Sequence, residues 1–424
     1  MNQDVVYRKL DPKFVSQDPI LTEEILRFKI NLYLDKLSTG MGVTTLFLYH
    51  CTKNVIILSP YTSMVDIKQQ KDIEKKVVFI HGTADGAWGL VEKKIDNCEH
   101  VVINATADGF IKLKENKPEI YNKILNYCHI VADEWHTVFG NTFSKTLPKL
   151  YEILFETPIP YIVTTGTSII NHLEVPDDVQ IMVLDYKVRE KKELAIHLCK
   201  SEKNEIEKSI ALHIYDCLKN GLKPAIATNN KKYLKVCPEL TRELLAGDAM
   251  KAKSKLVTKF DEVTNIGDAD VAFFSTKYVP GADFEGDISI HTIADGSFKA
   301  DSKTTQEIVQ APGRARIGYR NSKLTYKPSE GHRCEREIIS EIQQFDRNKP
   351  TYAADTRELF YEFMMAQTYS SVDRLIENLN RYGIDAKIIC EDSDYIDIDE
   401  KSTLATSLSN LMKNREVNIE RSFV

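Results

Sequence analysis

The sequence predicts an α/β protein with parallel sheets, arranged as two successive lobes and a mainly helical tail. Dense β-branched runs at 54–60 and 100–106 alternate with helical stretches, and such runs are typical of strands that helices cover on both faces. The alternation begins again after a polar link near 189–193. Every group with evident chemistry stands at the end of a strand, which is where ligands bind in open α/β sheets.

Size, charge and cysteine usage limit the class of protein. The chain has 424 residues, of which 42% are hydrophobic and 28% charged, and it can bury the cores of two or three domains. No apolar run reaches the roughly 18–20 residues that span a bilayer, and residues 1–11 lack a signal-peptide stretch, so a cytoplasmic protein without a membrane partner is expected. Eight cysteines without a Cys-x-x-Cys pair predict a reducing compartment and no zinc site. The net charge of -6 requires any nucleic-acid site to be a local basic groove.

The first distinctive element is a glycine-rich turn at 38–45, which follows a predicted helix at 22–34. Its two glycines let backbone amides face a phosphate, and an apolar segment follows directly. This pattern predicts a phosphate loop of the Gly-x-Gly-Lys-Thr kind, in which a threonine hydroxyl binds Mg²⁺. The residues predicted to bind the nucleotide are Gly40, Met41, Gly42, Val43, Thr44 and Thr45, with Thr44 as the Mg²⁺ ligand. A glycine-rich turn that binds no nucleotide is the alternative.

Val43 departs from the phosphate-loop pattern, because it stands where a lysine ammonium would reach the β- and γ-phosphates. A loop without this charge can still cradle phosphate but stabilises the transition state less, so turnover should fall more than nucleotide affinity. Lys36 and Lys53 are near enough in the sequence to supply a substitute cation.

An acidic pair, Asp133 and Glu134, closes the apolar run 130–132 and marks the carboxyl end of a buried strand. Magnesium takes hard oxygen ligands, and an attacking water needs a base beside it. Asp133 is therefore the predicted Mg²⁺ ligand and Glu134 the predicted water activator. Trp135 is predicted to be a core residue. The alternative for the acidic pair is an ordinary solvated surface position.

The remaining elements follow in order along the chain. Up to residue 316 they are a helix at 147–155, a strand at 161–167, a helix at 203–220, strands at 224–230, 269–276 and 288–293, and the segment 305–316. The tail has the pattern of amphipathic helices at 335–346, 355–369, 371–382 and 402–413, with one strand at 386–390. The predicted domains are 1–189, 190–334 and 335–424.

The elements in this order resemble those of superfamily 2 helicases of the Asp-Glu-x-His type, which have two RecA-like domains. They are the phosphate loop, strand ends at Ser59-Pro60 and Thr106, Asp133-Glu134-Trp135-His136, Thr165-Gly166-Thr167, Ser275-Thr276 with Gly281-Ala282-Asp283-Phe284, and Gln310-Ala311-Pro312-Gly313-Arg314-Ala315-Arg316. The last element is the most specific, and it is similar to that of viral origin-binding helicases. The resemblance covers roughly residues 36–320, about two thirds of the chain.

The resemblance implies a fold of two tandem RecA-like P-loop NTPase domains, with ATP and Mg²⁺ as cofactors. It implies catalytic roles for Asp133, Glu134, Gln310, Arg314 and Arg316, with Gln310 and the arginines reaching the γ-phosphate from the second domain. It also implies that nucleotide state is coupled to domain position by His136, Thr165 and Thr167. The residues that it implies along the nucleic-acid track are Ser59, Pro60, Thr106, Thr228 and Thr276.

The implied function is an ATP-dependent helicase or translocase on single-stranded or duplex nucleic acid, with DNA favoured. A role in replication, recombination or repair, a phage or mobile-element origin with action in the host cytoplasm, and a replication-protein partner at the C-terminal helices would fit so compact a helicase. One alternative is a non-hydrolysing nucleic-acid-binding or scaffold protein on the same fold. Another is a different P-loop enzyme, such as a packaging motor or nucleotide kinase, but these classes need no γ-phosphate sensor on a second lobe.

Overall fold

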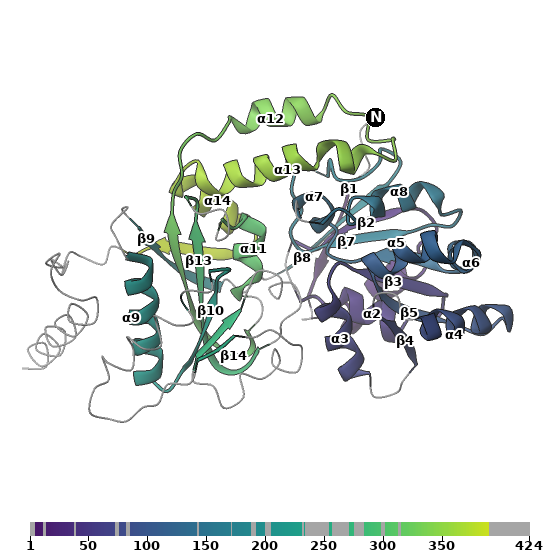
Figure 1. The fold of residues 1–424 in the computed structure, drawn as a ribbon, viewed down its shortest axis with the longest axis horizontal. Coiled ribbons are helices and arrows are strands. Elements are labelled where there is room, and N and C mark those ends of the chain that lie inside the picture. Colours follow the sequence, from purple (N-terminus) through teal and green to yellow (C-terminus); the bar gives the residue numbers. More distant parts are fainter. Residues whose placement is uncertain are drawn as a thin grey trace, which may run out of the picture. The chain divides into compact units, whose positions relative to one another are not determined.

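Two parallel sheets organise the computed structural model of the chain (Figure 1). One packing unit consists of Met1–Lys191, Gly331–Thr368 and Arg381–Gly383, and the other consists of Lys192–Glu330, Tyr369–Asn380 and Ile384–Val424. The structure describes residues 5–11, 14–37, 40–72, 76–81, 85–141, 144–170, 172–187, 192–199, 205–230, 233, 254–256, 271–274, 284–297, 302–312 and 315–389. Within these residues, no helix is long and apolar enough to cross a membrane.

The first sheet has eight strands in the order β1-β8-β2-β7-β6-β3-β5-β4, and all neighbouring strands are parallel. Its strands are β1 (Val5–Leu10), β2 (Leu32–Asp35), β3 (Val55–Ser59), β4 (Val77–Ile80), β5 (Val102–Thr106), β6 (His129–Ala132), β7 (Ile162–Thr165) and β8 (Gln180–Tyr186). The helices of this part are η1 (Val15–Gln17), α1 (Pro19–Leu26), α2 (Val43–Tyr49), α3 (Thr62–Lys71), α4 (Asp85–Asp96), α5 (Ala107–Asn116), α6 (Pro118–Tyr127), α7 (Thr137–Gly140) and α8 (Lys149–Glu156). Every position of β3 and β5 is buried, as expected of strands in a sheet covered on both faces.

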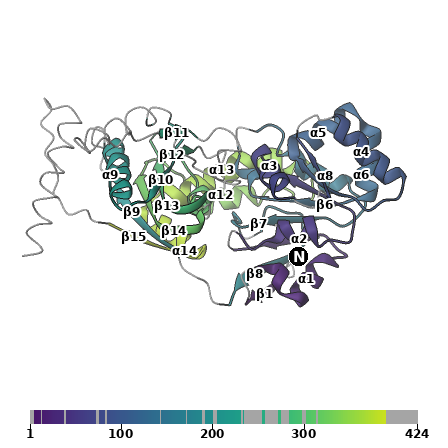
Figure 2. The same ribbon diagram turned by 90° about the horizontal axis from the view of Figure 1, so that it is seen from below.

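Alternate residues of the central strands contribute to two separate apolar cores. Tyr33 and Ile56 belong to one core, which also holds residues of α4, α5, α6 and α8. Leu34 and Ile57 belong to the other core, with residues of α1 and α2. Figure 2 shows these two groups of helices on opposite faces of the sheet. Because side chains along a strand point to alternate faces, a strand between two cores must be apolar at every position, and this explains the continuous apolar runs of the sequence.

The predicted helix at 22–34 is wrong in its second half. Helix α1 begins earlier, because Asp18 accepts a hydrogen bond from Leu21 N at 3.0 Å and Pro19 fits the first turn. The helix ends at Leu26, and β2 then pairs with β7 on one side and β8 on the other. Short apolar runs are ambiguous between helix and strand, and here two pairing partners far along the chain decide for the strand.

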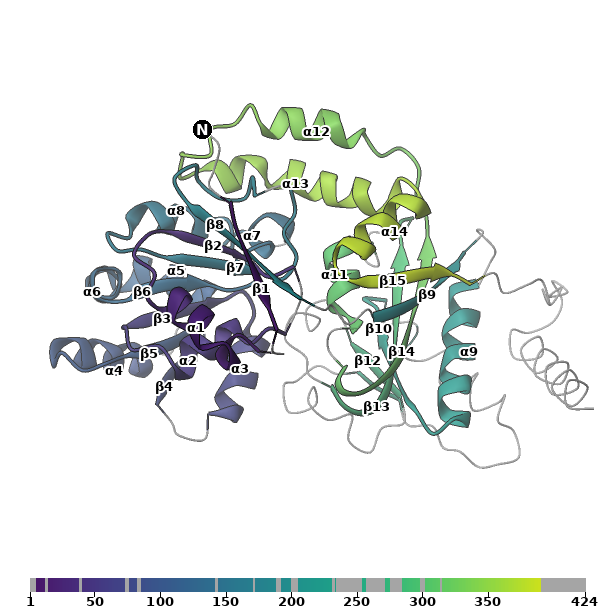
Figure 3. The ribbon, with the colours of Figure 1, turned by 180° about the vertical axis from the view of Figure 1, so that it is seen from behind.

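The second sheet has seven strands in the order β11-β12-β10-β13-β14-β9-β15, and all neighbours are again parallel. Its strands are β9 (Lys192–Leu198), β10 (Lys223–Ala227), β11 (Ser254–Leu256), β12 (Val271–Phe274), β13 (Phe284–Asp295), β14 (Ala315–Lys327) and β15 (Ile384–Ile388), and its helices include α9 (Glu205–Lys219) and α11 (Thr305–Gln310). The tail strand β15 lies beside β9 at one edge of this sheet (Figure 3). The predicted class, an α/β protein with two parallel sheets, is confirmed.

The tail helices do not stand apart from the two sheets. The predicted tail helices at 335–346, 355–369 and 371–382 correspond to α12 (Glu335–Ile342), α13 (Tyr352–Tyr369) and α14 (Val372–Arg381), while 402–413 lies outside the described residues. Phe360 and Met364 of α13 are buried in the same core as Phe139, and the ring centroids of Phe139 and Phe360 are 4.5 Å apart. The predicted domain boundaries near 189 and 334 stay predictions, because residues that pack together need not fold as one domain.

We expect Phe360→Ala to lower the free energy of unfolding of the first unit by about 3–5 kcal/mol, because it empties a fully buried ring position. Chemical denaturation followed by circular dichroism measures the loss. The exposed Glu358→Ala on the same helix is the matched control and should change the stability little. Equal stability of the two variants would mean that α13 does not complete this core.

Candidate nucleotide site

The glycine-rich turn lies between β2 and α2. Gly40 and Gly42 have φ angles of 85° and 78°, the left-handed region in which a side chain is strained. Gly42 directly precedes α2, and a Cβ added there would lie 3.4 Å from the Phe14 ring. Met41 and Val43 are buried in the apolar core on the α2 face, whereas Thr44 is half-buried and Thr45 is exposed. Both glycines of the predicted turn thus adopt a conformation that favours glycine, and its residues 38 and 39 lie outside the described part.

The hydroxyl of Thr44 and the carboxylate of Asp133 meet across 89 positions of sequence. Thr44 Oγ1 donates to Asp133 Oδ2 at 2.7 Å, and Asp133 is only 5% exposed at the end of β6. Adjacent oxygen ligands of an octahedral Mg²⁺ lie about 2.9 Å apart, since each Mg–O distance is about 2.1 Å. The two predicted metal ligands therefore fit the ion without rearrangement. The same hydrogen bond stabilises the site when no metal is bound.

Two lysines flank the Asp133 carboxylate. Lys36 Nζ lies 3.6 Å from Oδ1, and Lys68 Nζ lies 3.3 Å from Oδ2. Lys36 directly follows β2, and its backbone N–H donates to Thr165 O at 2.8 Å, while Lys68 is carried by α3. Burial alone raises the pKa of Asp133, but Lys68, Lys36 and the Thr44 hydroxyl together hold that pKa well below its ordinary value. Burial lowers the pKa of Lys68, against the attraction of Asp133.

The structure distinguishes between the two lysines that the sequence offered as substitute cations. Lys36 contacts Asp133, whereas Lys53 Nζ lies 4.1 Å from the centre of the Phe28 ring and donates to Phe28 O. Sequence reasoning missed Lys68, because nothing in the local pattern of a polar helix distinguishes one lysine from its neighbours. Only the adjacency of β3 and β6 in the sheet brings α3 to the site.

Glu134 stands in a strained backbone conformation next to Asp133, one of the two predicted metal ligands. Its φ is 50°, a region that residues other than glycine seldom adopt, and its backbone N–H donates to Asp133 Oδ1 at 3.1 Å. The Thr137 hydroxyl donates to Glu134 O at 2.8 Å, which closes the turn. The Glu134 carboxylate is buried and lies 3.6 Å from His136 Nδ1. The acidic pair is thus buried, so the alternative of a solvated surface pair does not hold.

His136 links the acidic pair to the end of β7. Its Nδ1 lies 2.9 Å from Thr165 Oγ1 and 3.3 Å from Thr167 Oγ1, and all three side chains are buried. The three residues predicted to act in coupling therefore form one cluster. Trp135 is 1% exposed and its ring N–H donates to Glu174 O at 2.9 Å, which confirms it as a core residue.

The residues predicted along the nucleic-acid track are mostly turned inward. Ser59 and Thr106 end adjacent strands as register partners, and both side chains are buried. Thr106 Oγ1 accepts from Gly109 N at 3.2 Å and caps α5, while Ser59 Oγ donates to Asn104 at 3.3 Å. Pro60 is half-buried. In this arrangement the Ser59 and Thr106 hydroxyls stabilise the ends of β3 and β5. A contact with nucleic acid would then be made by the segments that follow these strands.

The predicted residues of the second sheet are only partly described. Thr228 follows β10 and is buried, with Asn230 N donating to its hydroxyl at 3.1 Å. Gln310 is the last residue of α11 and is also buried. Thr276 and Arg314 lie outside the described residues, and Arg316 belongs to β14 at a position whose side chain is not described.

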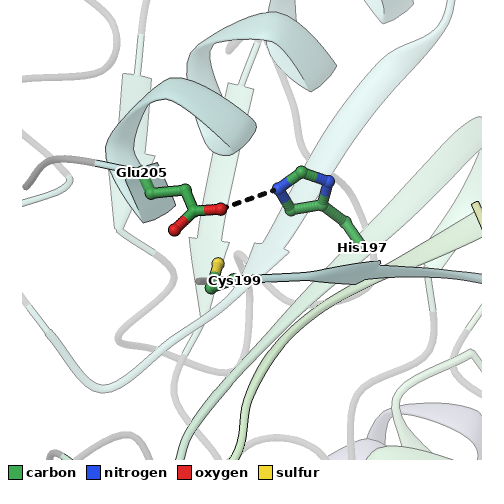
Figure 4. A group of neighbouring side chains, drawn as sticks. All are labelled: His197, Cys199 and Glu205. Carbon is green, nitrogen blue, oxygen red and sulfur yellow. Dashed lines mark ion pairs between the residues drawn. The ribbon is translucent and has the colours of Figure 1, made fainter. Parts of the chain in front are cut away.

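A further group of metal-type ligands lies at the end of β9 (Figure 4). Donor atoms of His197, Cys199 and Glu205 all lie within 4.8 Å of one another. Zinc sites use these ligand types, but structural ones are closed by a fourth ligand, and no fourth His, Cys, Asp or Glu joins this group among the described residues. His197 Nε2 lies 3.8 Å from Glu205 Oε1, and burial together with Glu205 raises the pKa of the Cys199 thiol. The group has the geometry of an ion pair beside a neutral thiol.

Comparison with solved structures identifies the fold. The Mycobacterium smegmatis helicase Lhr bound to single-stranded DNA and AMP-PNP matches with a TM-score of 0.51 and 12% identity, over 88% of this chain and 54% of that one. The DUF1998 helicase MrfA bound to DNA matches with a TM-score of 0.52 and 12% identity, over 90% of this chain and 55% of that one. MrfA bound to DNA and AMPPNP gives a TM-score of 0.52 and 13% identity, over 89% and 61%. The chain has the fold of tandem RecA-like helicases.

The comparisons establish this fold and not an activity. No protein-family model and no curated protein matches the sequence. At 12–13% identity, the likeness to helicases carries no residue roles. The chain also spans only 54–61% of the length of these structures. The predicted fold of two RecA-like domains is confirmed, and the roles of single residues rest on the geometry given above.

We expect Asp133→Asn to destabilise the first unit in the absence of nucleotide, because it removes the carboxylate that pairs with the buried Lys36 and the half-buried Lys68. The loss in free energy of unfolding should be about 3–5 kcal/mol, as for other broken buried ion pairs. Denaturant unfolding measures it. A second change, Lys68→Met in the same chain, should recover part of the loss.

The control for this experiment is Asp96→Asn, which removes an exposed carboxylate paired with Lys123 at 2.8 Å and should leave stability nearly unchanged. If Asp133→Asn is no more destabilising than this control, the two lysines do not depend on Asp133 for their charge balance.

Proposed function

We propose that the chain is an ATP-dependent helicase or translocase of superfamily 2 that acts on nucleic acid, with DNA favoured. The observation that carries this proposal is the group around Asp133. Thr44 Oγ1 lies 2.7 Å from its carboxylate directly after a two-glycine turn, and Glu134 follows it in the chain. A hydroxyl and two carboxylates at the carboxyl edge of a RecA-like sheet are the groups that ATP hydrolysis needs.

Glu134 is the general base of the proposed reaction. Its buried carboxylate takes a proton from the attacking water, and the turn closed by Thr137 fixes where that carboxylate points. Thr44 and Asp133 would hold Mg²⁺, which when bound offsets the charge of the phosphates. His136 lies between Glu134 and Thr165, so a shift of the base after loss of the γ-phosphate passes to the loop after β7, which includes Thr167.

The second lobe completes the site in this proposal. Gln310, Arg314 and Arg316 approach the γ-phosphate when the two lobes close, so that hydrolysis depends on closure. The α11 helix that carries Gln310 begins with a reciprocal cap, in which Glu307 N donates to Thr304 Oγ1 at 3.3 Å and Thr304 N donates to Glu307 at 2.9 Å. A helix fixed at its start holds Gln310 in a defined position, as its proposed contact with the γ-phosphate requires.

Nucleic acid follows the carboxyl edges of the two sheets in this proposal. The loops after Ser59-Pro60 and Thr106 contact the backbone in the first lobe, and those around Thr228 and Thr276 do so in the second. That Lhr and MrfA were solved with DNA supports DNA as the substrate. The proposal includes a role in replication, recombination or repair, with a replication protein bound at the C-terminal helices.

The second candidate function is a nucleic-acid-binding protein that does not hydrolyse ATP. The observation in its favour is Val43, whose side chain is buried in an apolar core where a phosphate-loop lysine would stand. Such a protein would bind strands with a steep dependence on salt and would ignore ATP.

The experiment that tests the proposal is steady-state ATP hydrolysis with and without single-stranded DNA, RNA and duplex DNA. Strands should stimulate hydrolysis, and Glu134→Gln should lower turnover by about 10²–10⁴-fold, because it removes the general base while keeping the shape of the side chain. Nucleotide binding should change little in this variant.

Glu115→Gln is the matched control, since that carboxylate is exposed and forms a surface ion pair with Lys149 at 3.2 Å. Its turnover should equal that of the unchanged protein. If the unchanged protein binds strands but hydrolyses no ATP, the motor function is wrong and the binding-platform function stands.

A further inference from the structure

Lys36 and Lys68 both lie within ion-pair distance of Asp133, the carboxylate that also accepts a hydrogen bond from Thr44. We propose that Lys36 supplies the positive charge that this loop lacks at Val43, and that Lys68 is a positioning residue that holds Asp133 when Lys36 turns to the phosphates. This inference rests on the proposed function, because it assigns the cation of the same nucleotide site.

Val43 carries no charge that could reach the phosphates, and its surroundings explain why a charge must come from another residue. Its side chain is 1% exposed and lies in the same core as Met41, Leu46 and Phe47. A charged group in that core would lose its hydration without gaining a partner. The turn therefore combines two glycines in the left-handed region with a first helical residue that belongs to the hydrophobic core.

The position of Lys36 fits contact with a bound nucleotide. Its ammonium lies 3.6 Å from Asp133 Oδ1, and the other oxygen of that carboxylate accepts from Thr44 Oγ1 at 2.7 Å. Ligands that share one Mg²⁺ lie within about 4.2 Å of one another, twice the Mg–O distance. A phosphate oxygen on an ion held by Thr44 and Asp133 would thus lie within a short side-chain movement of the Lys36 ammonium.

Charge balance supports the same assignment. In the described structure, Asp133 is the carboxylate that lies within ion-pair distance of both Lys36 and Lys68. Once that carboxylate serves a divalent cation, the buried Lys36 ammonium and the half-buried Lys68 ammonium need another anion, since an uncompensated charge away from water is costly. The phosphates of the nucleotide are the anion that arrives with the metal. Metal and nucleotide should therefore bind cooperatively at this site.

The lysines have different attachments, and this separates their roles. Lys36 follows β2 directly and is fixed at its backbone by the bond from its N–H to Thr165 O at 2.8 Å, so it belongs to the loop that receives the phosphates. Lys68 reaches Asp133 from α3, which follows β3. With Lys68 in place, Asp133 keeps one cationic neighbour when Lys36 moves.

The test compares Lys36→Met, Lys36→Arg and Lys68→Met with Lys53→Met in the full chain, by ATP turnover, affinity for a fluorescent ATP analogue with Mg²⁺, and thermal unfolding. Lys36→Met should lower turnover by about 100-fold, the loss typical of removing one group that stabilises transition-state charge, with a smaller effect on affinity. Lys36→Arg should keep more activity than Lys36→Met. Lys53→Met is the matched control, because Lys53 contacts Phe28 and not Asp133.

Lys68→Met has its own readout. It removes a cation that competes with Mg²⁺ for Asp133, so half-maximal analogue binding should need less Mg²⁺ than in the unchanged protein. A purely structural role of Lys68 would not lower the Mg²⁺ concentration that half-maximal analogue binding needs. An unchanged or higher Mg²⁺ requirement would overturn the role given to Lys68.

The outcomes separate this inference from the proposed function. Suppose that the unchanged protein hydrolyses ATP, and that Lys36→Met shows a normal thermal unfolding transition and hydrolyses ATP equally well. The inference that Lys36 replaces the missing lysine is then overturned, and the proposed function survives. If the unchanged protein hydrolyses no ATP, the function fails and analogue affinity decides the inference. If Lys36→Met then binds the ATP analogue more weakly than Lys53→Met does, the inference about Lys36 is supported. Equal affinity of the two variants overturns the inference, and so does a lack of analogue binding by the unchanged protein.

Discussion

The buried carboxylate of Asp133 is the constraint on which the candidate nucleotide site depends. A carboxylate removed from water needs partners, and three supply them: the Thr44 hydroxyl, Lys36 and Lys68. Each comes from a different element, namely the start of α2, the end of β2 and the middle of α3. Satisfying one buried charge therefore fixes the phosphate loop, the strand before it and a helix from the neighbouring crossover in a single arrangement.

The parallel topology makes this arrangement possible. The order β2-β7-β6-β3 places four strands side by side, and their carboxyl ends carry Lys36, Thr165, Asp133 and Ser59 in or just after the last residue. Because all strands run the same way, groups more than a hundred residues apart in the chain meet at one edge. The two cores beneath them keep the strands rigid, and α13 closes one of these cores.

The sequence was informative where one local rule decided the structure. Continuous β-branched runs predicted β3, β5 and β6 because a strand between two cores has no polar side. The glycine pair predicted the turn at Gly40 and Gly42 because their φ angles need glycine. The sequence failed at β2, where pairing with β7 and β8 overrode a helical spacing.

In the candidate site, too, some residues could be predicted from local motifs, whereas others depend on which strands are neighbours in the sheet. Asp133, Glu134 and Thr44 follow from motif spacing, and the structure brings Thr44 to Asp133. Lys68 could not be found, because its contact depends on which strands are neighbours and not on residues near it in the chain. The burial of Val43 was equally hidden, since a valine at the start of a helix gives no sign of the core that it enters.

The backbone conformation bears on the choice between the two candidate functions, ATP hydrolysis and the binding of strands alone. Among the described residues, four residues other than glycine have positive φ angles. Two of them, Leu37 and Glu134, are the second residues after β2 and β6, next to the candidate nucleotide site. Such conformations cost about 1–3 kcal/mol each and persist only where the surroundings impose them. A platform that only binds strands has no use for a carboxylate held in this way beside Asp133. The hydrolase that we propose does, because its general base must be fixed before the water arrives. The strain at Glu134 is therefore an argument for the proposed hydrolysis, although the loop lacks its lysine.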